Sequence, residues 1–115
     1  MNRKPKWKPE YDHEIEHAIS ARSKGNEGMA RVCARRAAGI VIGEYLLRRG
    51  YTQPNSSAYD RLTLFNSLPE VNEDMKVITS HFLLRVSHDH TLPGQIDLIS
   101  EAQCLKKTLL LDSTN

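Results

Sequence analysis

One long segment, residues 27–49, constrains the fold more than any other part of this sequence. Its apolar side chains recur every three or four residues, which predicts an α-helix, and they cover much of the helix circumference. They are Ala30, Cys33, Ala34, Ala37, Ala38, Ile40, Val41, Tyr45, Leu46 and Leu47. A helix of this length spans about 34 Å. Because residues 37–39 are all small, another helix can approach closely there.

Four further segments show the same helical spacing. Residues 10–24 place Ile15, Ala18 and Ile19 at intervals of three and four, and we expect this helix to bury Ile15 and Ile19. The remaining helices are expected over residues 58–68, 73–86 and 95–111.

Cap and turn residues separate these segments. Asn26, Ser57 and Asn72 each precede a helix, and their side chains can accept a hydrogen bond from an N–H of the first turn. Gly50 is expected to end the longest helix, and Pro69 to end the short helix that follows Ser57.

The order of these elements predicts an all-α protein, since no stretch alternates apolar and polar residues as a strand would. Five helices with short connections favour an up-down antiparallel bundle of four to five helices. We expect a single domain over residues 10–111, between a basic flexible tail (1–9) and a C-terminal tail (112–115). The broad apolar surface of the longest helix fits either the centre of one chain or an interface in a homodimer.

Composition narrows the class of protein. The chain has 115 residues, a size typical of one domain, and 39% of them are apolar, too many for a disordered chain. No run approaches the roughly 18 apolar residues of a membrane helix, and no apolar stretch follows the basic N-terminus as in a secretory signal. Cys33 and Cys104 lie far apart, which fits a reduced protein better than a disulfide scaffold. We therefore expect a cytoplasmic protein.

The net charge is unevenly distributed. It is +2 for the whole chain, yet residues 1–9 hold four basic side chains and no acidic one. The rest of the chain has 12 basic and 14 acidic residues, a formal charge of −2. Any phosphate must therefore be bound by local groups rather than by general attraction to the folded part.

A polar segment at residues 85–90 is the main candidate for chemistry. Arg85 can hold a phosphate with two hydrogen bonds. His90 or His88 can transfer protons near neutral pH, and Asp89 can orient one of them. Such a set supports attack of an RNA 2′-hydroxyl on its own phosphodiester without a metal. The alternative is a histidine-rich helix end whose cationic rings interact favourably with the helix dipole.

A second, basic group lies in the middle of the longest helix. Arg31, Arg35 and Arg36 are candidates for binding phosphate or RNA. Alternatively, they pair with Glu27 and with acidic residues of the neighbouring helix.

The third motif, at residues 13–17, matches the His-Glu-x-x-His pattern of zinc peptidases. On a helix, His13 and His17 lie one turn apart and can share a zinc ion, while Glu14 activates its water. A zinc peptidase needs a third ligand, and nothing in the sequence marks one. We favour a solvated charged face, and we expect no metal and no cofactor.

Four features follow one another along the chain: a short glycine-containing break, an Ala-rich second helix, a short helix after the next loop, and a late Glu-Ala pair. The break is at residues 25–28, and the Ala-rich helix covers residues 30–40 and closes at 46–50. The short helix runs from residues 58–62 to 68–69, and the Glu-Ala pair is at 101–102. Over about residues 10–111 this pattern resembles the HEPN superfamily (higher eukaryotes and prokaryotes nucleotide-binding domain). It is most similar to the small bacterial members associated with minimal nucleotidyltransferases.

The resemblance implies an antiparallel helical bundle, a homodimer and, in many members, metal-independent ribonuclease activity, often as the toxin of a toxin–antitoxin pair. The family's motif is Arg followed after four to six residues by His, near the dimer interface, and Arg85 with His90 matches that spacing. Val86 departs from the pattern, because a polar residue commonly follows the Arg. Members without the motif bind nucleotides or partners, so the alternative is a non-catalytic module that binds a nucleotide, a nucleotidyltransferase or an antitoxin.

Overall fold

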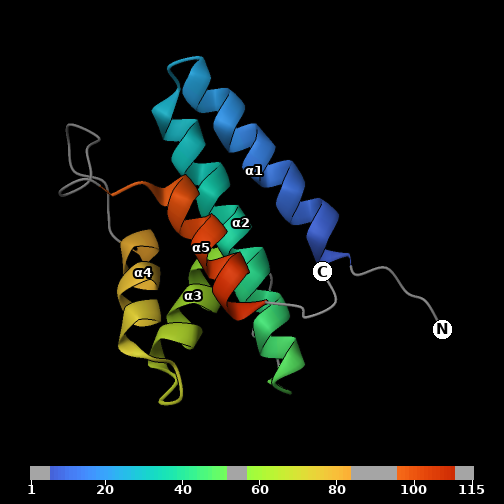
Figure 1. Cartoon of the computed structure of the whole chain (residues 1–115), viewed down its shortest axis with the longest axis vertical. Coiled ribbons are helices and arrows are strands. Elements are labelled where there is room, and N and C mark those ends of the chain that lie inside the picture. The colour runs from blue at the N-terminus through green and yellow to red at the C-terminus, as the bar shows by residue number, and fades with distance from the viewer. Residues whose placement is uncertain (1–5, 52–56, 84–95, 111–115) are drawn as a thin grey trace.

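Five α-helices make up the fold in the computed structural model of the chain, which describes residues 6–51, 57–83 and 96–110 (Figure 1). They are α1 (Trp7–Ser23), α2 (Glu27–Arg48), α3 (Ala58–Ser67), α4 (Glu73–Leu83) and α5 (Leu98–Leu109). These three stretches contain no strand, so the predicted all-α bundle is confirmed. None of the described helices is both long enough and apolar enough to cross a membrane.

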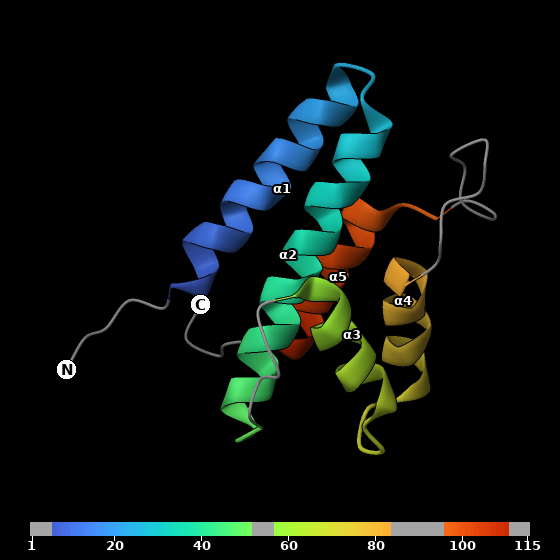
Figure 2. The same cartoon turned by 180° about the vertical axis from the view of Figure 1, so that it is seen from behind.

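The central helix is α2, which contacts α1, α3 and α5 (Figures 1 and 2). Fully buried side chains occur on several of its sides, among them Cys33, Ala38 and Leu46. Most of the apolar surface read from the sequence is therefore covered within one chain, although Leu47 is 59% exposed.

A tight turn joins α1 and α2 into an antiparallel hairpin. Gly25 has φ +79°, a left-handed conformation that residues with a side chain rarely adopt. Asn26 then caps α2, because its side-chain oxygen accepts a hydrogen bond of 3.1 Å from the N–H of Met29. Fully buried alanines, including Ala18 of α1 and Ala30 of α2, keep the core between the two helices thin.

Helix α3 begins beside the middle of α2. Ala58 lies against Gly39, and Arg61 lies against Gly43, so the first turn of α3 runs in the same direction as α2. Helix α4 then returns antiparallel to α3 (Figure 2), and Asn66 joins the pair by donating to the Thr79 hydroxyl at 2.8 Å. This arrangement leaves the last turn of α4 beside α2 and α5.

The first helix differs from expectation at two places. It begins at Trp7, so residues 7–9 belong to the helix rather than to a basic tail. The buried rings of Trp7 and Tyr11 lie edge to face, with their centres 6.3 Å apart. The expected burial of Ile19 was wrong: this side chain is 49% exposed. The buried side of α1 is formed by Trp7, Tyr11, Ile15, Ala18 and Ala21.

Candidate functional site

The main predicted catalytic residues follow α4 directly. That helix ends at Leu83, and Arg85, His88, Asp89 and His90 lie outside the described residues. The geometry of this candidate site is therefore built from the last turn of α4 and from the groups around it.

An imidazole–carboxylate pair lies at this end of α4. Nδ1 of His81 is 2.7 Å from Oε1 of Glu101 in α5, and both side chains are about one-fifth exposed, at 23% and 22%. In the neutral tautomer that donates from Nδ1 to this carboxylate, Nε2 is the acceptor of the ring. A histidine held in this way is suited to accept a proton from a substrate hydroxyl.

The sequence did not single out His81, and it marked Glu101 only as part of a Glu-Ala pair. The two residues are 20 positions apart on different helices. Only the packing of α4 against α5 brings them together. The one available signal was that His81 lies in the helix that precedes the polar segment 85–90 in the sequence.

One arginine of the predicted basic group also reaches the last turn of α4. Nε of Arg35 donates a hydrogen bond of 2.9 Å to the backbone carbonyl of Phe82. Carbonyls in the last turn of a helix have no partner within the helix, so a cation is favourable there. We call Arg35, His81 and Glu101 the α4-end cluster.

The other two arginines of that group have different surroundings. Arg31 is half-buried one turn before Arg35, and its positive charge helps to lower the pKa of Glu27. Arg36 is exposed and, with Arg61 of α3 and Glu14 of α1, lines a cavity of about 350 Å³. The three arginines therefore do not form one continuous surface.

The cavity places two guanidinium groups near one carboxylate. Burial lowers the pKa of Arg61, and the negative charge of Glu10 partly opposes this effect. Nη1 of Arg61 donates to the carbonyl of Gly39 at 3.3 Å, an arrangement that the missing side chain of Gly43 makes possible. The cavity is thus bordered by two cations and one carboxylate.

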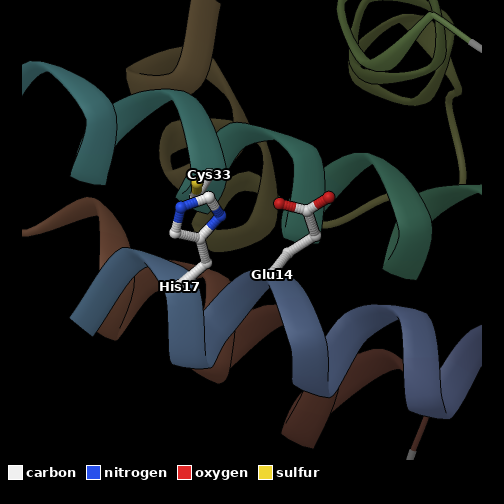
Figure 3. A group of neighbouring side chains, drawn as sticks. All are labelled: Glu14, His17 and Cys33. Carbon is white, nitrogen blue, oxygen red and sulfur yellow. The ribbon is translucent and has the colours of Figure 1, made fainter. Parts of the chain in front are cut away.

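A third group combines two residues of the His-Glu-x-x-His motif with one from α2. Ligand atoms of Glu14, His17 and Cys33 all lie within 4.8 Å of one another (Figure 3). His13, the first residue of the motif, is exposed, and its ring centre is 6.2 Å from that of His17. The structure thus brings a cysteine to the motif, which the sequence did not indicate.

The thiol of this group is fully buried. Burial raises the pKa of Cys33, and the negative charge of Glu14 raises it further, whereas the positive charge of Arg36 opposes the change. Because burial outweighs the charge of Arg36, Cys33 stays a neutral thiol at neutral pH.

Comparison of the chain with protein-family models, with curated proteins and with solved structures finds no match. Arguments about function therefore depend on the three groups described above.

Proposed function

We propose that the chain is a HEPN-like helical domain that binds RNA and cleaves it without a metal, acting as a homodimer. The observation that carries this proposal is the His81–Glu101 pair at 2.7 Å, because it supplies an oriented proton acceptor directly before the segment that holds Arg85 and His90. The all-α fold with a central α2 is compatible with the family resemblance.

The proposed reaction is transesterification within the RNA. A base removes the proton of a 2′-hydroxyl, the oxygen attacks the adjacent phosphorus, and the bond to the 5′-oxygen breaks as that oxygen takes a proton from an acid. The products are a 2′,3′-cyclic phosphate and a 5′-hydroxyl. Arg85 stabilises the charge that develops on the phosphoryl oxygens, and His90 is the general acid or base. His81, held by Glu101, assists proton transfer.

The test is RNA cleavage by the purified protein in the presence of EDTA. We expect fragments that end in a cyclic phosphate. Arg85→Ala and His90→Ala should each lower the rate by about 10²- to 10⁴-fold, and Glu101→Gln should lower it less. His13→Ala is the matched control, because this exposed histidine of α1 lies outside the α4-end cluster. Cleavage that survives both Arg85→Ala and His90→Ala would contradict the assignment.

A second candidate is a non-catalytic module that binds a nucleotide or a partner such as a nucleotidyltransferase or an antitoxin. The cavity that Arg36 and Arg61 line favours this alternative, because two guanidinium groups there can hold the phosphate of a nucleotide. It predicts no RNA cleavage, and binding of a nucleotide that weakens in Arg36→Gln. Light scattering tests the homodimer for either candidate.

A further inference from the structure

The group formed by Glu14, His17 and Cys33 combines three different kinds of metal ligand. Glu14 and His17 lie three residues apart, so both side chains extend from one side of α1 toward α2, where Cys33 is located (Figure 3). The group is not confined to the surface, because Cys33 is completely buried.

The surroundings give the group one buried side and one open side. Cys33 is 0% exposed and is preceded one turn earlier by Ala30, also 0% exposed. His17 is exposed to solvent. Glu14 is half-buried and also lines the cavity that Arg36 borders. An ion can therefore enter from the side of His17 and reach the sulfur.

The hydrogen bonds around Glu14 are incomplete. Its Oε1 atom is buried and has no hydrogen-bond partner among the described residues. A buried carboxylate oxygen without a donor is costly, and a bound cation removes that cost.

We propose that Glu14, His17 and Cys33 bind one Zn²⁺ ion that links α1 to α2. Thiolate and imidazole ligands favour zinc over magnesium or calcium, which prefer oxygen. Two anionic ligands balance the charge of the ion, and the proton of the Cys33 thiol passes to solvent on binding. Three protein ligands leave the fourth tetrahedral position for water.

The required movement is small. Zinc–ligand bonds of about 2.0 to 2.3 Å place tetrahedral ligand atoms about 3.3 to 3.6 Å apart. The present separations, all within 4.8 Å, reach these values by small rotations of the side chains. The site differs from a His-Glu-x-x-His peptidase centre, because Glu14 is a ligand instead of a base and Cys33 replaces His13.

The test measures metal binding directly on the untagged, reduced protein. We expect one zinc per chain after dialysis, and cobalt(II) in its place should give the ultraviolet thiolate-to-metal band together with the intense visible bands of a tetrahedral ion. Cys33→Ala should remove the thiolate band. It should also lower the affinity for zinc by more than about 100-fold, because loss of a residue that only supports a ligand already lowers metal affinity by about 10- to 100-fold. Competition with a chromogenic chelator measures this affinity.

Two matched variants serve as controls. His13→Ala removes the neighbouring histidine of α1, and Cys104→Ser removes the other cysteine; both should bind zinc like the wild type. Circular dichroism should show that Cys33→Ala retains its helices, since alanine already occupies neighbouring buried positions. Failure of the wild type to bind one zinc, or equal losses in His13→Ala and Cys33→Ala, would overturn the proposal. RNA cleavage in EDTA is a separate measurement, so either proposal can fail alone.

Discussion

At the scale of single residues, two glycines determine how closely α3 approaches α2. A Cβ atom on Gly39 would lie 2.6 Å from the Cβ of Ala58 and 2.8 Å from its Cα, closer than such atoms can come. A Cβ on Gly43 would lie 2.6 Å from Nη1 of Arg61. The sequence predicted close approach at residues 37–39, and Gly39 confirms it. The role of Gly43 could not be predicted, because it depends on which residue of α3 faces it.

Gly39→Ala is therefore expected to destabilise the protein, although alanine is the better helix former. The contact with the backbone of Ala58 must be relieved by moving α3, at a cost of about 1 to 3 kcal/mol. The matched control is Gly28→Ala in the first turn of α2, where the nearest atom to a new Cβ is 3.9 Å away. There the change should stabilise by about 0.5 to 1 kcal/mol. Urea unfolding measures both, and equal effects in the two variants would contradict this account of α3 packing.

At the scale of helices, Arg22 connects three elements at one end of the bundle. Its guanidinium donates to both carboxylate oxygens of Glu27, at 3.1 and 2.7 Å, and to Oδ1 of Asp97 at 3.0 Å. Asp97 is the N-cap of α5 and accepts from the N–H of Ile99 and of Ser100. The end of α1, the start of α2 and the start of α5 are thus held by one side chain.

This connection predicts a pH dependence of stability. The hydrogen bonds from Arg22 hold the pKa of Glu27 below its ordinary value of 4.5. A carboxylate with a lower pKa in the folded protein stabilises the fold above its unfolded pKa, and this contribution is lost as the pH falls through the folded value. We expect Arg22→Gln to destabilise at neutral pH by less than about 1 kcal/mol, since both side chains are partly exposed.

The difference between Arg22→Gln and wild type should shrink as the pH falls below 4.5, the ordinary pKa of Glu27. Urea unfolding at several pH values measures it. Lys8→Gln is the control, because the Lys8–Asp12 pair is exposed and its atoms are 3.5 Å apart. A difference that stays the same toward acid pH would show that Arg22 acts by packing instead of by its charge.

Local signals account for most of what the sequence revealed about the helices. The expected caps Asn26, Ser57 and Asn72 all accept a first-turn N–H, and Gly50 follows α2 with φ +84°. The start of α1 was predicted at residue 10, too late, because Trp7 stands among lysines and prolines. Its place in the helix depends on its burial against the rest of the protein, which the local sequence does not show. Asp97 was missed as a cap although aspartate before an apolar helix is a local signal.

At the scale of the whole molecule, the candidate sites depend on contacts between helices. The His-Glu-x-x-His pattern marked Glu14 and His17 with His13 as one motif, but Cys33 joins Glu14 and His17 only through the register of the α1–α2 hairpin. Likewise, Arg35 was a candidate for binding phosphate, with pairing to acidic side chains as the alternative, and the hydrogen bond that it makes to the carbonyl of Phe82 could not be read from the sequence. Spacing along one helix is set by the chain itself, whereas contacts between helices are set by how the core packs.

The distribution of charge over the whole chain predicts how RNA binding depends on salt. Residues 10–115 carry −2, so the proposed binding depends on a few local arginines. For single-stranded RNA each phosphate contact contributes a slope of about −0.7 in a plot of log affinity against log salt concentration, so about three contacts give a slope near −2.

Residues 2–5 precede α1 and include Arg3 and Lys4, so their deletion leaves the buried Trp7 in place and should change the slope by less than about 1. Fluorescence anisotropy with labelled RNA measures both slopes. A slope that falls from near −2 to about −0.7 after the deletion would mean that Arg3 and Lys4, and not the helical bundle, make most of the phosphate contacts.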